Sequence, residues 1–140
     1  MSEKTIYTAQ VHTVGGREGA AKSSDGQLDI KLSTPGTNRP GTNPEQLFAA
    51  GWSACFEGAL AHVARQSGTQ LPTETAVDAE VRLHLDEAEG FFITGRLNVS
   101  LPGLPDEVAQ DLIERAHKTC PYSKMTQGGI DASVALAVTA

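Results

Sequence analysis

The segment 47–60 is apolar on nearly every side of the helix that its sequence predicts. Asn43 is a good N-cap, Pro44 suits the first helical position, and Gln46 can complete a capping-box-like pair. The helical pattern runs to about Gln66, where a Ser-Gly pair ends it. A helix without a polar face is surrounded by protein on all sides. A chain of 140 residues can barely enclose such a helix alone, so we expect a second subunit to help cover it.

Regular alternation of apolar and polar residues predicts the strands. Residues 77–85 and 93–101 alternate on either side of a D-E-A-E-G turn, which is typical of an antiparallel hairpin with one solvent-exposed face. Residues 5–13 and 27–33 have the same period and are interpreted as half-buried strands. Residues 130–138 alternate as well, so we expect the chain to end in a strand.

A second helix is predicted over about residues 105–118, with Val108, Leu112 and Ala116 as its buried stripe. Its first turn is acidic and its last turn is basic, and both favour the helix dipole. Helices and strands come in blocks rather than in strict alternation, which predicts an α+β fold. At this length we expect residues 1–140 to form a single domain.

The charge balance and the apolar runs argue against several classes of function. The net charge of −6 disfavours a nucleic-acid partner, which needs a basic face. No apolar run approaches the roughly 18 residues that span a bilayer. The N-terminus lacks the apolar core of a signal peptide, so we expect a cytoplasmic protein without membrane contact. Thiols are mostly reduced there, which disfavours a lasting structural disulfide but allows a transient catalytic one.

The two cysteines, Cys55 and Cys120, are the residues best suited to chemistry. Cys55 lies in the middle of the apolar helical run, and Cys120 opens the motif C-P-Y-S just after the second helical pattern. One interpretation is inert packing. The other is a redox pair, in which one thiol attacks and the other resolves.

A reactive Cys55 needs a fixed cation nearby, because a thiol attacks as the thiolate and burial disfavours that charge. Cys55 lies roughly three turns inside its helix, beyond the reach of the helix N-terminus. Arg17, in the tight turn G-G-R-E-G, is the candidate cation, and Arg39 and Arg65 compete with it on sequence alone. Glu45 would orient the arginine, because a carboxylate holds a guanidinium in a bidentate fork.

The spacing of Glu45 and Cys55 imposes a geometric condition. The two residues are ten positions apart, about 15 Å of helix rise, so one straight helix cannot bring them together. Either the helix is broken, or the Glu45 beside Cys55 comes from a partner chain. We prefer the partner chain, because the same helix is too apolar for a monomer.

Other chemically suggestive residues have simpler interpretations. G-W-S-A-C resembles a nucleophile elbow without its closing glycine, which disfavours Ser53 as a hydrolase nucleophile. His62 lies seven residues after Cys55, about 10.5 Å along a helix and too far for a dyad. His117 and Cys120 could form a metal site with Cys55, but they lack the dense spacing of zinc ligands.

Three aromatic residues, Phe48, Trp52 and Phe56, recur at i, i+4 and i+8 on the apolar helix. Core packing is the default interpretation of such a stripe. Lining an apolar substrate pocket is the alternative.

Four segments together resemble the organic hydroperoxide resistance (Ohr) family of the OsmC-like superfamily. They read G-G-R-E-G, S-D-G-Q-L-D-I-K-L-S-T-P, G-T-N-P-E-Q-L-F-A-A-G-W-S-A-C-F and C-P-Y-S. The resemblance runs from about residue 5 to the end, with segment order and spacing intact. It departs from the family at Trp52, where tyrosine is common, and at Gln127, where arginine is frequent. These departures concern pocket shape and substrate preference rather than the reaction.

The resemblance implies a fold, an activity and site residues. The fold is an intertwined homodimer of curved antiparallel sheets around a long central helix, with active sites at the subunit interface. The activity is reduction of organic hydroperoxides through a Cys55–Cys120 disulfide, with no cofactor or metal. Cys55 matches the attacking cysteine, Cys120 the resolving cysteine, Arg17 the arginine of the G-G-R turn, and Glu45 the glutamate of N-P-E-Q. The implied reductant is a lipoylated protein carrying dihydrolipoyl groups (dihydrolipoamide).

Three alternatives stay open at this point. The chain could be a metal-binding protein that uses Cys55, Cys120 and His117. It could be a non-catalytic binding module in which both cysteines fill the core. Within the superfamily, the osmotically inducible (OsmC) branch would have a broader peroxide specificity.

Overall fold

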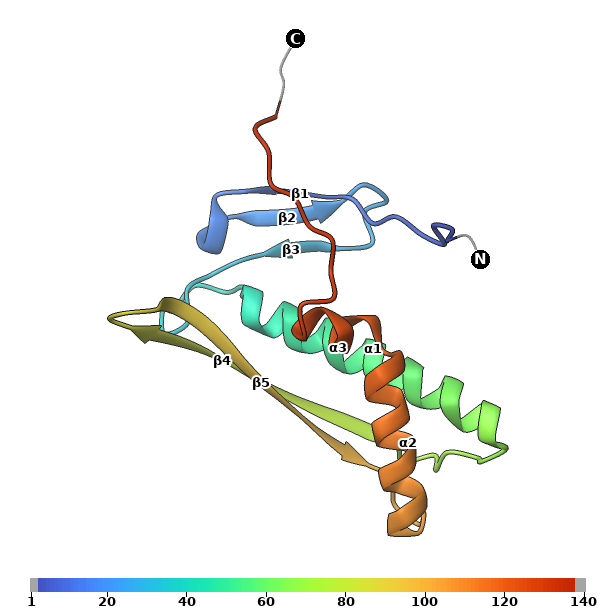
Figure 1. Cartoon of the computed structure of the whole chain (residues 1–140). Helices are drawn as coiled ribbons and strands as arrows, with labels where there is room; N and C mark the ends of the chain where they lie inside the picture. The colour runs from blue at the N-terminus through green and yellow to red at the C-terminus, as the bar shows by residue number, and fades with distance from the viewer. Residues whose placement is uncertain (1–2, 138–140) are drawn as a thin grey trace. The chain divides into compact units, whose positions relative to one another are not determined.

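The computed structural model describes residues 3–137, and the chain divides into two compact units, Met1–Phe48 and Ala49–Ala140 (Figure 1). The first unit holds β1 (Val11–Val14), the 3-10 helix η1 (Gly16–Glu18), β2 (Ala20–Ser23), β3 (Asp29–Lys31) and the start of α1 (Pro44–Ser67). The second holds the rest of α1, β4 (Ala76–Asp86), β5 (Gly90–Ser100), α2 (Asp106–Thr119) and α3 (Pro121–Thr126). The predicted α+β fold with antiparallel strands and a long helix is confirmed. That residues 1–140 form one domain stays a prediction.

The first unit contains a three-stranded antiparallel sheet in the order β1-β2-β3. The G-G-R-E-G segment joins β1 to β2 and forms η1. Gly15 adopts a φ of 78°, and a Cβ on Gly19 would lie 1.8 Å from the carbonyl oxygen of Val14. The turn therefore requires glycine on both sides of Arg17, which explains the spacing seen in the sequence.

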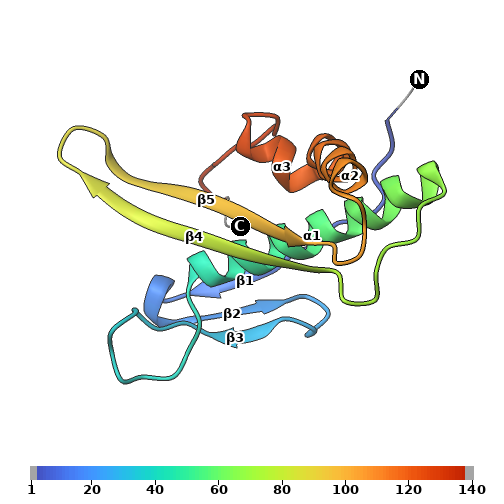
Figure 2. The ribbon, with the colours of Figure 1, turned by 90° about the horizontal axis from the view of Figure 1, so that it is seen from below.

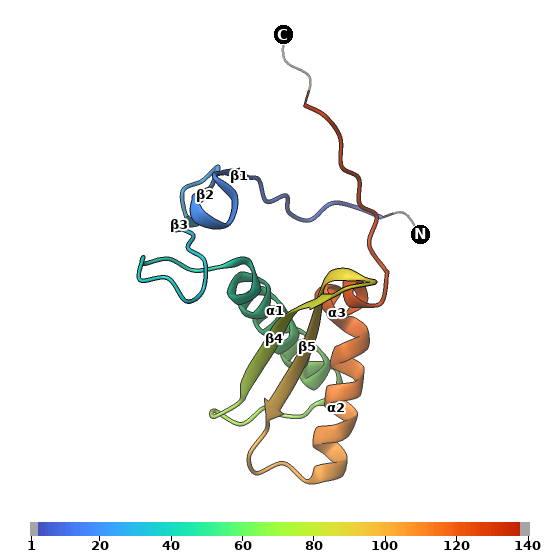
Figure 3. The same cartoon turned by 90° about the vertical axis from the view of Figure 1, so that its left-hand side faces the viewer.

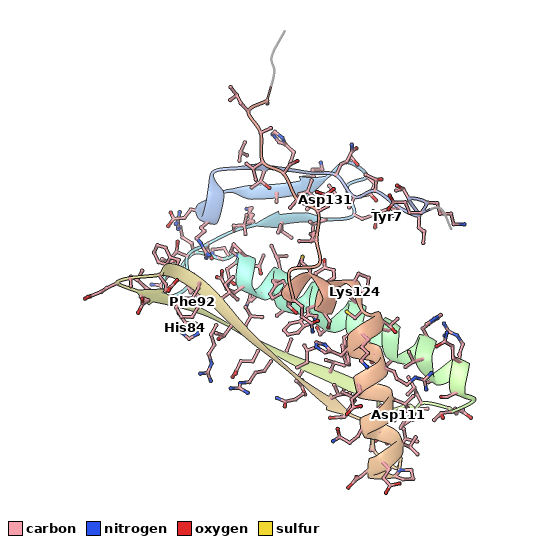
Figure 4. The ribbon with its side chains drawn as sticks, viewed as in Figure 1. Tyr7, His84, Phe92, Asp111, Lys124 and Asp131 are labelled. Atoms are coloured by element: carbon pink, nitrogen blue, oxygen red, sulfur yellow. The ribbon has the colours of Figure 1, made fainter. Side chains whose placement is uncertain are left out.

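Two predicted strands of this unit are shorter in the structure. The predicted strand 5–13 forms only from Val11, which lies opposite Ser23 at the end of β2. The Ser24 N–H still donates to the Gln10 carbonyl at 2.9 Å, but no strand pairing continues over residues 5–10. The alternation of residues 5–13 would put Tyr7 on the apolar side of that strand, but its side chain is 75% exposed (Figure 4). The predicted strand 27–33 is reduced to β3.

The long helix α1 confirms the prediction of a helix from Asn43 to about Gln66. The side-chain oxygen of Asn43 accepts a hydrogen bond from the backbone N–H of Gln46 at 2.9 Å, as an N-cap does. The side chain of Gln46 accepts from the Thr42 hydroxyl at 2.7 Å. The hydroxyl of Thr42 thus replaces the Asn43 backbone in the expected capping box.

The predicted hairpin forms as β4 and β5, paired in register from Ala76 opposite Ser100 to Asp86 opposite Gly90. Figure 2 shows the hairpin running along α1. The apolar side chains near the open end of β4 are half-buried, whereas those near its turn are exposed. Leu83 and Leu85 of β4 lie opposite Ile93 and Phe91 of β5, and all four are exposed. We call these four residues the hairpin-tip patch. On the opposite face His84 stacks on Phe92 at 4.8 Å between ring centroids (Figure 4).

The predicted strand 130–138 is wrong for the single chain. Residues 130–137 form no strand, and Val134 and Leu136 are almost fully exposed. Alternation alone cannot make a strand, because a strand needs the free edge of a neighbour. Val138 lies outside the described residues.

Helices α2 and α3 follow the hairpin and contact each other, as seen in Figure 3. Leu112 and Ala116 of the predicted stripe are fully buried, and Val108 is half-buried. Cys120 ends α2, with its N–H on the carbonyl of Ala116, and caps the start of α3. Among residues 3–137, no helix has the length and apolar content needed to cross a bilayer.

Glycine on α1 allows α3 to approach it closely. A Cβ added at Gly51 would lie 2.9 Å from Tyr122 Oη and 3.1 Å from Tyr122 Cε2. We expect Gly51→Ala to lower the free energy of unfolding by about 1–3 kcal/mol through overpacking. Gly58 on the same helix has open space around it, so Gly58→Ala is the matched control and should stabilise by about 0.5–1 kcal/mol. Urea unfolding measures both, and similar effects of the two substitutions would contradict this packing.

Candidate active site

The first pair of predicted site residues, Arg17 and Glu45, meets in the first unit. Arg17 Nη1 and Nη2 donate to the two carboxylate oxygens of Glu45 at 2.9 Å and 2.6 Å, which is the bidentate fork expected. Glu45 lies in the first turn of α1, and its side chain is only 12% exposed. The pair fixes the direction of the guanidinium, which keeps 43% of its surface exposed.

Each member of this pair stabilises the charge of the other. The hydrogen bonds from Arg17 hold the pKa of Glu45 below its ordinary value. The same bonds raise the pKa of Arg17, so the guanidinium stays cationic. The competing cation Arg39 pairs instead with Glu18, and Arg65 is exposed in the last turn of α1.

The second pair, Cys55 and Cys120, meets in the second unit. The Cys120 thiol donates to Cys55 Sγ with 3.3 Å between the sulfur atoms, and both thiols are free. Cys55 comes from the middle of α1 and is half-buried, whereas Cys120 is 0% exposed. A reagent from solvent therefore reaches Cys55 first, and Cys120 lies ready to react with it.

Burial raises the pKa of the Cys55 thiol above its ordinary value. A backbone hydrogen bond from Tyr122, in the first turn of α3, offsets part of this rise. The adjacent Cys120 raises the pKa further. Within the second unit Cys55 is thus mostly protonated at neutral pH, so a cation has to be added before it becomes a good nucleophile.

A hydrogen bond beside the sulfurs links the same two helices. The indole Nε1–H of Trp52 on α1 donates to Ser123 Oγ on α3 at 3.1 Å, and both side chains are buried. Trp52 and Cys55 are three positions apart on α1, as are Cys120 and Ser123 in C-P-Y-S. The two segments therefore run in opposite directions, with Trp52 opposite Ser123 and Cys55 opposite Cys120.

Sequence reasoning missed two residues of this site, Tyr122 and Ser123. The sequence did contain a signal for Ser123, because Trp52 and Cys55 in W-S-A-C have the same three-residue spacing as the first and last residues of C-P-Y-S. What the sequence lacked was the direction in which one segment runs along the other.

The other candidates do not join either pair. Ser53 donates its hydroxyl to the carbonyl of Ala49 at 2.7 Å, as a helical serine commonly does. His62 is exposed on α1. The Gln127 amide donates to His117 Nε2 at 2.8 Å. Within the described part of the chain, no three His, Cys, Asp or Glu side chains gather as a metal site would require.

The aromatic stripe is divided between packing and a cavity. Phe48 is half-buried, while Trp52 and Phe56 are buried and line a cavity of about 240 Å³. The other residues around it are Gly95, Arg96, Leu97, Val99, Ile113 and His117. Neither cysteine is among the described residues that line it. A substrate pocket formed by the stripe beside Cys55 stays a prediction.

The chain is similar to known proteins over nearly its whole length. A family model described as OsmC-like protein matches residues 21–135. The organic hydroperoxide resistance protein of Xanthomonas axonopodis pv. citri is 48% identical over 139 residues, 96% of this chain and 97% of that protein. The crystal structure of organic hydroperoxide resistance protein OhrB of Bacillus subtilis has a TM-score of 0.83 at 44% identity, covering 91% of this chain and 96% of that one. An organic hydroperoxide resistance protein from Elizabethkingia anophelis gives 0.82 at 43% identity, covering 92% and 94%.

The difference in exposure between the two sulfurs is directly measurable. In the reduced, folded protein we expect iodoacetamide to label Cys55 well before Cys120, because Cys120 is inaccessible to solvent. Peptide mass spectrometry after brief labelling gives the ratio, and labelling in denaturant gives the reference in which both react. Equal labelling of the two cysteines in the folded state would contradict the described arrangement.

Proposed function

Because this chain belongs to the OsmC-like family and its relatives are named organic hydroperoxide resistance proteins, we propose that it is a cysteine-based peroxidase that reduces organic hydroperoxides to alcohols. The observation that carries the proposal is the pair of free sulfurs 3.3 Å apart, one accessible and one buried. That arrangement suits a thiol that meets the peroxide and a second thiol that resolves the product.

In the first step the Cys55 thiolate attacks one oxygen of the O–O bond. The bond breaks, the alkoxide takes up a proton and leaves as the alcohol, and the Cys55 sulfur becomes a sulfenic acid. In the second step the sulfur of Cys120 attacks the sulfur of Cys55. A disulfide forms and the sulfenic oxygen leaves as water, which ends the exposure of Cys55 to further oxidation.

Recycling requires two electrons from a dithiol. We propose dihydrolipoyl groups of a lipoylated protein, which the resemblance to the Ohr family implies. One dihydrolipoyl thiol attacks the Cys55–Cys120 disulfide, and the second displaces the protein thiol from the mixed disulfide. The products are two free cysteines and an oxidised lipoyl ring, so electrons and protons balance.

Arg17 supplies the cation that Cys55 needs in this proposal, with Glu45 fixing its direction. An arginine beside the sulfur favours the thiolate and stabilises the charge that develops on the leaving peroxide oxygen. Helix α1 runs unbroken from Pro44 to Ser67, which removes the broken-helix alternative. Ten residues of helix correspond to about 15 Å, so the Glu45–Arg17 pair that serves Cys55 comes from a partner chain.

A homodimer is also supported by surfaces that the single chain leaves uncovered. The hairpin-tip patch exposes four large apolar side chains on one face of β4 and β5. Residues 130–137 alternate like a strand, yet they form no strand pairing among the described residues. A second copy that covers the patch and pairs with this segment would bury both.

The apolar helix α1 would then favour alkyl and fatty-acid peroxides over hydrogen peroxide.

Single cysteine variants test the reaction. We expect Cys55→Ser to abolish turnover of cumene hydroperoxide, because no thiol remains to attack. Cys120→Ser should consume about one peroxide per chain and then stall, because Cys55 sulfenic acid is not resolved. Turnover is followed with dihydrolipoamide, glutathione and thioredoxin in parallel, and dihydrolipoamide should give the fastest cycling. Full activity of the Cys55→Ser variant would refute the proposed function.

The role of Arg17 predicts a change in pH dependence. An opposite charge within about 4–6 Å lowers a thiol pKa by roughly 1–3 units, so Arg17→Met should slow Cys55 oxidation at pH 7 about 10- to 1000-fold. The loss should shrink as pH rises, because the thiolate then forms without the cation. Stopped-flow oxidation rates across pH 5–10 measure this, and Arg39→Met, which loses only the pair with Glu18, is the matched control. Parallel pH profiles for the Arg17 variant and the wild type would contradict the role.

Mixing two inactive variants tests whether the site spans two chains. Chains carrying Arg17→Met keep Cys55, and chains carrying Cys55→Ser keep Arg17. If Arg17 acts across the interface, dissociating and reassembling the two together restores one complete site in each mixed dimer. If Arg17 acts on the Cys55 of its own chain, the mixture stays as inactive as its components.

A further inference from the structure

We propose that Trp52 is a positioning residue for the resolving step, and that its hydrogen bond to Ser123 keeps Cys120 within reach of oxidised Cys55. The inference rests on the proposed peroxidase function. It gives Trp52 the task of holding Cys120 in place, which the two cysteines do not perform themselves. It concerns the fate of the sulfenic acid after the first step rather than the attack on the peroxide.

Several contacts hold α3 against α1, among them the Tyr122 ring beside Gly51 and the Tyr122 backbone beside Cys55. Two others recur at equal spacing on both segments. The sulfurs of Cys55 and Cys120 are 3.3 Å apart, and one turn away Trp52 Nε1 lies 3.1 Å from Ser123 Oγ. The bond between Trp52 and Ser123 joins two buried side chains one turn away from the sulfurs. Together with the sulfur contact, it fixes the register of α3 along α1.

Helix α3 depends on such a contact because it is only six residues long, and a helix that short has little stability of its own. Its first residues follow directly from α2 through Cys120, whose N–H still belongs to the last turn of α2. At its far end, Gln127 hydrogen-bonds to His117, but both side chains are exposed. The bond between Trp52 and Ser123 is buried, so water does not compete for it.

The position of α3 affects how fast the disulfide between Cys55 and Cys120 forms. A disulfide requires the two sulfurs to approach from 3.3 Å to about 2 Å, a movement on the order of 1 Å that the docked α3 already nearly provides. If α3 moves away, the resolving attack slows, because misplacement by about 1 Å costs up to roughly a hundredfold in rate. The sulfenic acid then survives long enough to meet a second peroxide and become sulfinic acid, which is not recovered by thiol exchange.

The test measures how the sulfenic acid is partitioned. Wild type, Trp52→Phe and Ser123→Ala are each cycled with dihydrolipoamide and increasing cumene hydroperoxide, and intact-protein mass spectrometry counts disulfide and sulfinic acid. We expect the peroxide concentration that gives half-inactivation to fall about ten- to a hundredfold in both variants. This partition does not depend on the rate of the first oxidation, because both products form from the same sulfenic acid.

Control variants separate positioning from general loss of stability. Val63 is buried on the same helix, two turns beyond Cys55, so Val63→Ala destabilises the protein without removing either described contact with α3 and should leave the partition unchanged. Ser123→Ala alters no residue of the cavity that Trp52 lines, so an effect shared by both variants belongs to the hydrogen bond. The combined Trp52→Phe and Ser123→Ala variant should be no more sensitive than either single one, because both remove the same bond.

The outcomes distinguish the inference from the proposed function. A lowered threshold in both single variants, absent in Val63→Ala, supports the positioning role. An unchanged partition in both variants overturns that role while the peroxidase function stands. If wild-type Cys55 forms neither sulfenic acid nor disulfide with organic peroxide, the function and the inference fail together.

Discussion

The alignment of α3 along α1 is the constraint on which the proposed chemistry of this chain depends. It brings the two sulfurs within 3.3 Å although they are 65 positions apart in sequence. Gly51 makes room for the Tyr122 ring, and the bond between Trp52 and Ser123 fixes the register. These contacts leave one sulfur accessible and the other buried, which is the asymmetry that an attacking and a resolving thiol need.

The same packing works against ionisation. Burial that excludes water from Cys55 also raises its pKa, so close packing and nucleophilicity conflict at this position. A preformed cation would resolve that conflict, and we propose the Arg17 guanidinium for this role, because its fork with Glu45 already fixes its direction. The proposed homodimer follows from this requirement together with the continuous helix α1 and the uncovered hairpin-tip patch.

Sequence predicted the parts of the fold that depend on local interactions. The cap at Asn43, the full length of α1 and the alternation of the β4–β5 hairpin are set within short stretches, and all three were confirmed. Residues 5–10 and 130–137 failed as strands of the single chain because pairing depends on an edge elsewhere, which alternation does not reveal. Charge and the tight turn made Arg17 one of three candidate partners for Glu45, and the resemblance to the Ohr family selected it. Ser123 was missed because its partner lies 71 positions away.

The only tryptophan of the chain is the one that hydrogen-bonds to α3, one turn from Cys55. Indole emission responds to hydrogen bonding at Nε1–H and to quenching by nearby sulfur. The protein therefore carries its own optical probe of the cysteine pair, without any attached label. Each passage from dithiol to disulfide would register as a change in the light emitted by Trp52.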